Sequence, residues 1–100
     1  MTGTKNDEEK TKLDLLPHTA LIKIANIFEF GAKKYGKYNW TSGFKWMRLY
    51  GACLRHLFAW KLKESADPES GKSHLHHAAC CILMLIEHEE RALGEDDRQN

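Results

Sequence analysis

The stretch Ser73–Ile86, "SHLHHAACCILMLI", decides the fold that the sequence predicts. Its apolar side chains recur every three or four residues, as they do in a helix with one apolar face. Ser73 is a favourable N-cap, because its hydroxyl can accept a hydrogen bond from an early backbone N–H. We expect a helix that begins after Ser73 and buries one line of side chains, namely Leu75, Ala78, Ala79, Ile82, Leu85 and Ile86.

Two further helices are predicted upstream of this stretch. The first begins after Pro17 and ends near Gly36, which are residues suited to a helix start and a helix end. The second runs from about Phe44 to Lys63. No segment of useful length alternates apolar and polar residues, so no strand is predicted. The fold class is therefore all-α, a small bundle of three main helices that we expect oligomerisation to complete.

The length and composition suit one small domain. The chain has 100 residues, of which 42% are hydrophobic, and this supports one modest core. We expect the helical domain to span residues 13–93. The polar residues 1–12 are expected to be mobile, and residues 94–100 are expected to form a frayed tail.

The composition also argues against several classes of protein. A net charge of +1 with neutral histidines is too small for a typical nucleic-acid-binding protein. No apolar run reaches about 18 residues, so no membrane span is expected, and the polar first residues do not form a secretion signal. Three cysteines, two of them the adjacent Cys80 and Cys81, do not form a disulfide framework. We expect a cytoplasmic protein.

The segment before the third helix contains part of a phosphate-binding P-loop motif. Gly71, Lys72 and Ser73 match the end of that motif. Ala66 stands where its first glycine belongs, however, and no strand precedes it. The motif requires both features, so we reject a P-loop here.

A zinc site is a second interpretation of the same segment. His74, His77 and Cys81 fall on one helix face and could hold a metal ion. The chain has no Cys-x2-Cys pair, and free cysteines are usually small buried apolar residues. We therefore expect Cys80 and Cys81 to contribute to packing.

A site for a divalent cation and phosphates is the third interpretation. Glu64, Asp67 and Glu69 cluster in the loop between the second and third helices, and carboxylate oxygens suit Mg²⁺ or Mn²⁺. Imidazoles titrate near neutrality, so the histidines around this loop are candidate general bases, namely His56, His74 and His77. Spacing alone slightly favours the plainer interpretation of a solvated acidic loop with exposed histidines.

Basic residues on the first two helices are candidates for holding phosphate oxygens. Arg48 and Arg55 lie on the polar side of the second helix. Lys33 follows Glu29 by four residues on the first helix. This pair is either a surface ion pair or a metal-binding carboxylate beside a phosphate-binding lysine, and spacing alone favours the ion pair.

Four segments, taken in order, resemble a known family. They are "KLDLLP" (12–17), "EFGAKKYGKYNW" (29–40), "LRHLFAW" (54–60) and "DPESGKSHLHHAACC" (67–81). Together they resemble the N-terminal domain family of phage dATP/dGTP diphosphohydrolases, over residues 12–90. The order of the four segments makes the resemblance specific.

The resemblance implies an all-α enzyme of phage nucleotide metabolism. Members of the family are associated with hydrolysis of dGTP or dATP to the monophosphate and pyrophosphate. The implied fold is similar to that of the MazG-like pyrophosphatases, which act as dimers or tetramers with Mg²⁺ or Mn²⁺. We therefore expect a homodimer or homotetramer that acts on deoxynucleoside triphosphates in the host cytoplasm.

The expected site departs from the MazG-like pattern. Those enzymes hold metal through Glu-Glu-x-x-Glu and Glu-x-x-Asp helical motifs, whereas the third helix here begins with His74-x-x-His77. Our expectation is a cation held by carboxylates, namely Glu29, Glu64, Asp67 and Glu69, with Lys33, Arg48 and Arg55 on the phosphates. A centre built from histidine and aspartate is the alternative. A non-catalytic protein that sequesters nucleotides is the competing function, and a module that docks a host protein is a third.

Overall fold

The computed structural model describes residues 2–99, and these residues form three α-helices. They are α1 (His18–Tyr35), α2 (Trp46–Lys61) and α3 (His74–Arg91), with short 3-10 helices at Leu13–Leu15 and Asn39–Ser42. Within residues 2–99 there is no β-strand, only two isolated bridges. No helix in the described part of the chain is long and apolar enough to cross a membrane. The all-α prediction is confirmed.

The helix boundaries follow the residues that predicted them. Helix α1 begins directly after Pro17 and ends at Gly36, whose φ of 98° is poorly suited to other residues. Helix α3 begins after Ser73, whose hydroxyl accepts a hydrogen bond from the Leu75 N–H at 3.1 Å. Helix α2 is two residues shorter at each end than predicted.

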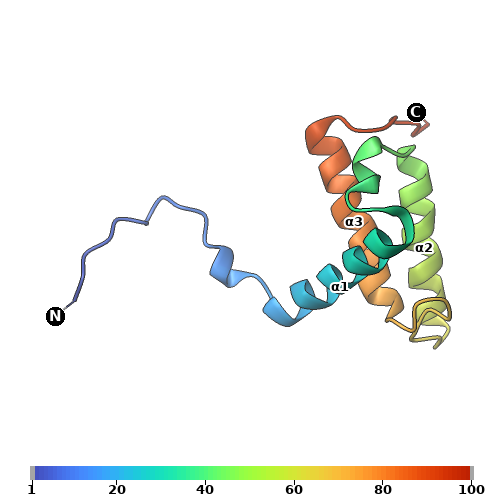
Figure 1. Ribbon diagram of the computed structural model, residues 1–100, viewed down its shortest axis with the longest axis horizontal. Coiled ribbons are helices and arrows are strands. Elements are labelled where there is room, and N and C mark those ends of the chain that lie inside the picture. The colour runs from blue at the N-terminus through green and yellow to red at the C-terminus, as the bar shows by residue number, and fades with distance from the viewer. Residues whose placement is uncertain (1, 100) are drawn as a thin grey trace.

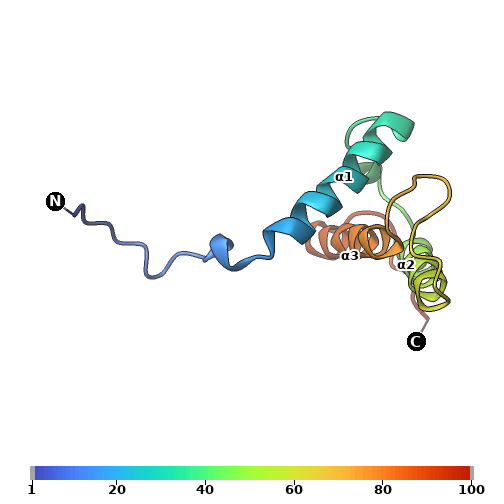
Figure 2. The same cartoon turned by 90° about the horizontal axis from the view of Figure 1, so that it is seen from below.

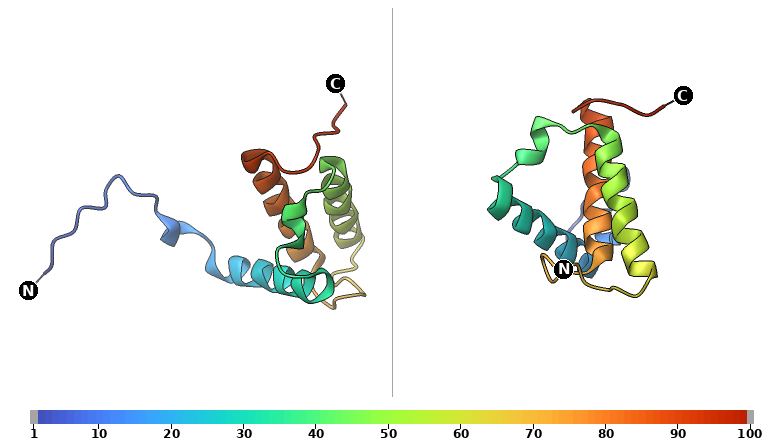
Figure 3. Two further views of the ribbon diagram at one scale, coloured as in Figure 1. Left: turned by 45° about the horizontal axis from the view of Figure 1, so that its top comes forward. Right: turned by 90° about the vertical axis from the view of Figure 1, so that its right-hand side faces the viewer.

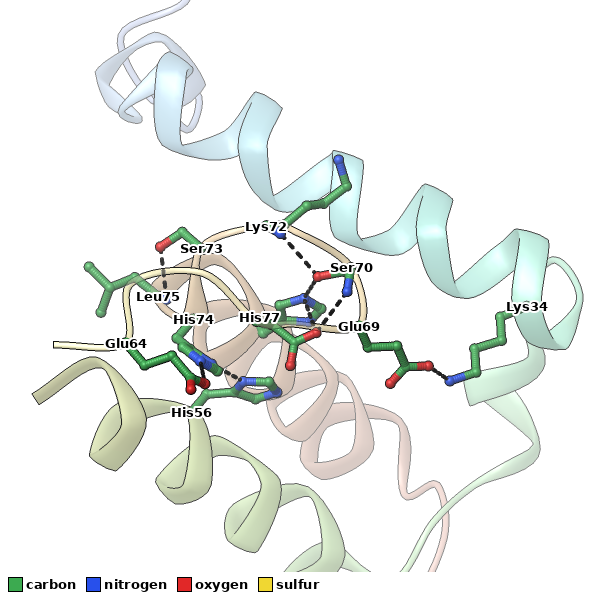
Figure 4. A network of polar contacts seen from close by, with 11 residues as sticks. Lys34, His56, Glu64, Glu69, Ser70, Lys72, Ser73, His74, Leu75 and His77 are labelled. Atoms are coloured by element: carbon green, nitrogen blue, oxygen red, sulfur yellow. Dashed lines mark hydrogen bonds and ion pairs between the residues drawn. The ribbon is translucent and has the colours of Figure 1, made fainter. Parts of the chain in front are cut away.

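Helices α2 and α3 form an antiparallel pair, and α1 lies across α3 (Figure 1; Figure 3). Helix α1 packs mainly against α3, at a steep angle to the pair (Figure 2). The chain before α1 extends away from the helices (Figure 1). Its mobility stays a prediction. The loop between α2 and α3 lies beside the C-terminal half of α1 (Figure 4), where Lys34 pairs with Glu69.

The core between α2 and α3 is made of small side chains. Cys53 of α2 packs against Ala78 and Cys81 of α3, with Ala52 and Leu57 partly buried beside them. Small residues let the two helix backbones approach closely, so modest side chains fill the interface. The prediction that the cysteines contribute to packing is confirmed, because all three are buried.

The predicted buried face of α3 is wrong for three of its larger members, whereas Leu85 is half-buried. Leu75, Ile82 and Ile86 are 41%, 46% and 48% exposed, whereas Ala78 is buried. The faces of α3 that meet α2 and α1 instead carry small or polar residues, including Cys80 and Cys81. Apolar spacing marks where a helix could be buried, but the partners decide which face is used.

The C-terminal segment, for which a frayed tail is predicted, accepts hydrogen bonds from the start of α2. The Trp46 N–H donates to the Glu95 carbonyl at 3.0 Å, and the Met47 N–H donates to Asp97 Oδ1 at 2.9 Å. The first turn of α2 has no capping side chain of its own, so the tail supplies acceptors for otherwise unpaired N–H groups. Gly94 is required for this approach, because a Cβ there would lie 2.0 Å from the Phe44 carbonyl oxygen.

His88 joins the end of α3 to the segment before α2. It is fully buried, its Nδ1–H donates to the Met84 carbonyl at 2.7 Å, and its Nε2 accepts from the Phe44 N–H at 3.1 Å. The ring also stacks on Phe44, with centroids 6.1 Å apart. A ring that donates at one nitrogen and accepts at the other is the neutral imidazole.

Replacing His88 should destabilise the fold. His88→Leu leaves the partly buried Phe44 N–H without an acceptor, and we expect a loss of about 1–3 kcal/mol in the free energy of unfolding. His88→Gln keeps an acceptor oxygen and should lose less. Urea denaturation followed by circular dichroism measures both variants. A His88→Leu protein as stable as the parent would show that this hydrogen bond is dispensable.

The buried cysteines should resist alkylation in the folded protein. Burial raises the pKa of the Cys80 thiol to about 12 and that of Cys81 to about 11, and it also raises the pKa of Cys53. All three thiols are therefore protonated at about pH 8, and the thiolate is the reactive form. We expect iodoacetamide to modify them only in denaturant, as read by intact mass. Fast modification without denaturant would contradict the packing described here.

Candidate functional site

A cavity of about 530 Å³ opens between the C-terminal half of α1 and the α2–α3 pair. The α1 side supplies aromatic and polar residues, together with the segment that follows the helix. The opposite side supplies His56 from α2, His77 from α3, and Asp67 and Glu69 from the loop between them. Lys34 of α1 pairs with Glu69 across the opening (Figure 4). Residues from all three helices therefore meet at one space.

The loop before α3 is held by Asp67. Its Oδ2 accepts from the Ser70 N–H at 3.0 Å, its carbonyl accepts from the Gly71 N–H at 2.7 Å, and its own N–H donates to the Lys72 carbonyl at 2.8 Å. This is a side-chain-stabilised turn. Helix α2 precedes this loop, and residues 2–99 contain no strand, so the rejection of a P-loop, which requires one, agrees with the structure.

Three histidines converge where α2 meets the start of α3. The rings of His56 and His77 stack with centroids 4.7 Å apart and planes 10° from parallel. His56 Nδ1 lies 2.8 Å from His74 Nδ1, and His74 Nε2 lies 2.8 Å from Glu64 Oε1 (Figure 4). His74 is 4% exposed, so its ring is fixed by these contacts and by burial.

The hydrogen-bond partners of His74 and His56 indicate which ring nitrogen carries the hydrogen in each. Glu64 is an acceptor, so His74 Nε2 carries a hydrogen. In the neutral ring His74 Nδ1 then has a lone pair, which accepts from His56 Nδ1–H. His56 Nε2 is left with a lone pair. Glu64, His74 and His56 thus form a short chain of hydrogen bonds that orients both rings.

His77 belongs to a second network with the turn. Its Nε2 lies 2.7 Å from Ser70 Oγ and 3.9 Å from Asp67 Oδ2, and Ser70 Oγ also accepts from the Lys72 N–H at 3.1 Å (Figure 4). The Phe30 and His77 rings pack edge to face, with centroids 6.3 Å apart. This network connects α3, the loop and α1.

The surroundings shift the pKa values of the cluster in consistent directions. Burial, reinforced by the neighbouring histidines, lowers the pKa of His56. Burial also lowers the pKa of His77, although Asp67 opposes it. Burial opposes the charge of Asp67, but hydrogen bonds from Ser70 outweigh it and lower the pKa of Asp67. At neutral pH the site therefore presents neutral imidazoles beside an ionised carboxylate.

The structure gathers some of the predicted metal-binding residues and separates others. Within residues 2–99, three side chains form a group that could hold a metal ion, namely His56, Asp67 and His74, with their ligand atoms within 4.8 Å of one another. Of the other predicted carboxylates, Glu64 contacts His74, Glu69 pairs with Lys34, and Glu29 lines the cavity. The four carboxylates do not form one cluster.

The basic residues predicted for phosphate binding lie elsewhere. Lys33 is exposed and is not among the residues that line the cavity. Arg48 lies over the Phe44 ring at 5.8 Å, and the Arg55 guanidinium lies beside Gly51. The cavity contains Lys34 instead. Its position four residues after Phe30 is a signal that could have indicated this face of α1.

Aromatic side chains are a second feature of the cavity that the predicted set of site residues did not include. Phe28, Tyr35 and Trp40 line it together with Asn39. Phe28 and Trp40 meet edge to face, with centroids 6.2 Å apart. The cluster of aromatic residues in "EFGAKKYGKYNW" was the available signal, because α1 and the turn after it bring them to one wall.

Comparison with known proteins relates this chain to one family. The family model described as dATP/dGTP diphosphohydrolase, N-terminal, matches residues 1–98. A protein of Salmonella phage PMBT28 named dATP/dGTP diphosphohydrolase is 32% identical over 99 residues, which are 99% of this chain and 34% of the phage protein. The chain thus spans about one third of that relative, and no solved structure matches it. The chain belongs to the dATP/dGTP diphosphohydrolase N-terminal family.

Proposed function

We propose that the protein hydrolyses purine deoxynucleoside triphosphates, dGTP or dATP, to the monophosphate and pyrophosphate in phage nucleotide-pool remodelling. The observation that carries this proposal is one cavity that joins an aromatic wall to a lysine and a histidine–aspartate cluster. The name of the Salmonella phage relative supports the same reaction.

The aromatic wall suits a nucleobase. A purine presents a flat face that stacks on aromatic rings, and Phe28, Tyr35 and Trp40 supply such rings. Asn39 offers an amide donor and an acceptor for the edge of a base. The volume of about 530 Å³ lies within the usual range for small-molecule sites.

The opposite end suits the phosphates. Lys34 places a cation at the opening, where Glu69 is its partner. A triphosphate carries several acceptor oxygens and would take the ammonium group from that single exposed carboxylate. Lys34 then fixes the position of the chain of phosphates relative to the histidines.

His77 is the proposed general base. Its lowered pKa leaves the ring neutral, and Ser70 holds its Nε2 at 2.7 Å. With Nε2–H donating to Ser70 Oγ, His77 Nδ1 has the lone pair and takes a proton from water. The hydroxide attacks the α-phosphorus, and the bond from that phosphorus to the bridging oxygen breaks as pyrophosphate leaves. Asp67, 3.9 Å from Nε2, stabilises the imidazolium that forms.

A divalent cation, Mg²⁺ or Mn²⁺, remains part of the proposal. Such an ion, when bound, would neutralise phosphate charge as the leaving group departs. Asp67 is the only one of the four predicted carboxylates in the cluster, and its neighbours there are imidazole nitrogens. This mixed donor set fits Mn²⁺ better than Mg²⁺, which prefers oxygen ligands.

A nucleotide-binding protein without hydrolytic activity is the second candidate. The chain matches about one third of the named relative, so the activity of that whole protein can depend on parts that the chain does not match. The same cavity would then hold a nucleotide without cleaving it.

A panel of nucleoside triphosphates separates these candidates. We expect dGTP or dATP, incubated with Mn²⁺, to give the monophosphate and pyrophosphate on ion-exchange chromatography, and Asp67→Asn to give neither. Recovery of intact nucleotide from a protein that binds it would favour the binding function. Release of tripolyphosphate and nucleoside would show that a different bond is cleaved.

Two adjacent lysines test the phosphate end. Lys34→Ala should raise KM for the triphosphate about 10-fold or more, because a charge-assisted contact is worth about 1.5–3 kcal/mol. The matched control is Lys33→Ala, which removes the neighbouring charge from outside the cavity and should leave KM within about twofold. Equal effects of the two substitutions on steady-state kinetics would place the phosphates elsewhere.

A further inference from the structure

We infer that His56, Asp67 and His74 form a binding site for a transition-metal ion, such as Mn²⁺, Co²⁺ or Zn²⁺, that discriminates against Mg²⁺. This site differs from the carboxylate site that the sequence predicted. It uses one carboxylate and two imidazoles in place of four carboxylates.

The candidate ligand atoms come from three elements and lie close together. His56 lies on α2, Asp67 on the loop and His74 at the start of α3, and their ligand atoms lie within 4.8 Å of one another. The two Nδ1 atoms are 2.8 Å apart. Two nitrogens bound to one ion at about 2.1 Å each, at a right angle, would be about 3 Å apart, which matches this spacing. Binding through both atoms replaces the hydrogen bond between the rings: His56 gives up its Nδ1 hydrogen, carries a hydrogen at Nε2 instead, and turns its Nδ1 lone pair toward the ion.

Glu64 orients the most deeply buried ligand. Its Oε1 holds His74 Nε2 at 2.8 Å, so the Nδ1 lone pair of His74 faces His56. A carboxylate behind a metal-bound histidine is a common arrangement, and it fixes both the tautomer and the ring plane. We therefore assign Glu64 to positioning and not to the metal itself. Asp67 is similarly held, by the Ser70 N–H at 3.0 Å.

The donor set determines which ions should bind. Imidazole nitrogen is a good ligand for Zn²⁺ and Co²⁺ and a weaker one for Mn²⁺, whereas Mg²⁺ demands oxygen ligands and gives up its water reluctantly. His56 and Asp67 both line the cavity, so an ion bound between them would be accessible from it. The role of such an ion in hydrolysis rests on the proposed function, but its binding does not.

Metal titration of the full chain tests this inference without any nucleotide. After treatment with a chelator, the protein is titrated with CoCl₂, MnCl₂, ZnCl₂ and MgCl₂ by calorimetry, and the Co²⁺ sample is also followed by visible absorption. We expect one equivalent of each transition metal to bind, and Mg²⁺ to bind at least about 10-fold more weakly.

Variants locate the site. His74→Ala and Asp67→Asn should lose the Co²⁺ signal, and Glu64→Gln should weaken Co²⁺ binding about 10- to 100-fold. The matched control is His76→Ala, a histidine of the same helix outside the cluster, which should bind normally. Circular dichroism checks that each variant is folded, and Asp67→Asn decides the outcome if the buried His74 proves necessary for folding.

The outcomes separate this inference from the proposed function. Absence of Co²⁺ binding, or equal binding by the parent and all variants, would overturn the metal site. Hydrolysis supported by Mg²⁺ alone in a protein that binds no Co²⁺ would overturn the inference and leave the function standing. Co²⁺ binding without hydrolysis of any nucleotide would support the metal site and overturn the proposed hydrolysis.

Discussion

The close packing of α2 against α3 is the contact on which the rest of the structure depends. Cys53, Ala78 and Cys81 are small enough for the two backbones to approach. That approach brings His56 of α2 against the first turn of α3, where His74 and His77 lie. A larger side chain in this interface would separate the helices and with them the histidines, since packed interiors accommodate added volume poorly. The packing of the core therefore also sets the positions of the histidines in the candidate site.

The loop between these helices holds the same histidines from the other side. The His74 N–H donates to the Ser65 carbonyl at 2.9 Å, and Asp67 closes the turn that carries Ser70 to His77. A loop held by so many of its own backbone bonds can present a carboxylate in a fixed place. The burial that lowers the pKa of His56 and His77 follows from the same arrangement.

Most of the fold could be predicted from the sequence because its helix ends are marked by residues with strong local preferences. Pro17, Gly36 and Ser73 act within a few residues, and helices α1 and α3 begin or end where they indicate. The buried face of α3 could not be predicted in the same way. Leu75 and Ile82 have the spacing of a core but lie exposed, because α2 and α1 meet other faces. Their exposure is compatible with the expectation that oligomerisation completes the bundle, which stays a prediction.

The sequence indicated which residues gather at the candidate site better than it indicated the role of each residue. Clustering along the chain indicated His56, Asp67, His74 and His77, and the structure brings them together. Spacing could not show that Glu64 faces a histidine, because that depends on how the loop turns back. Lys34 was missed because adjacent lysines on a helix differ only in the face they occupy, and that face is set by the crossing of α1 over α3.

The exposed ion pair between α1 and the loop is a contact that a bound triphosphate can replace at little cost in stability. Helix α1 packs mainly on α3, and Lys34 of α1 also forms an ion pair with Glu69 of the loop across the cavity. Both side chains are substantially exposed, at 40% and 61%, and exposed ion pairs contribute little to stability. A triphosphate that replaced Glu69 as the partner of Lys34 would therefore break little that holds the fold. The histidine–aspartate cluster, whose contacts are more numerous and more buried, would stay in place while Lys34 exchanged Glu69 for the phosphates.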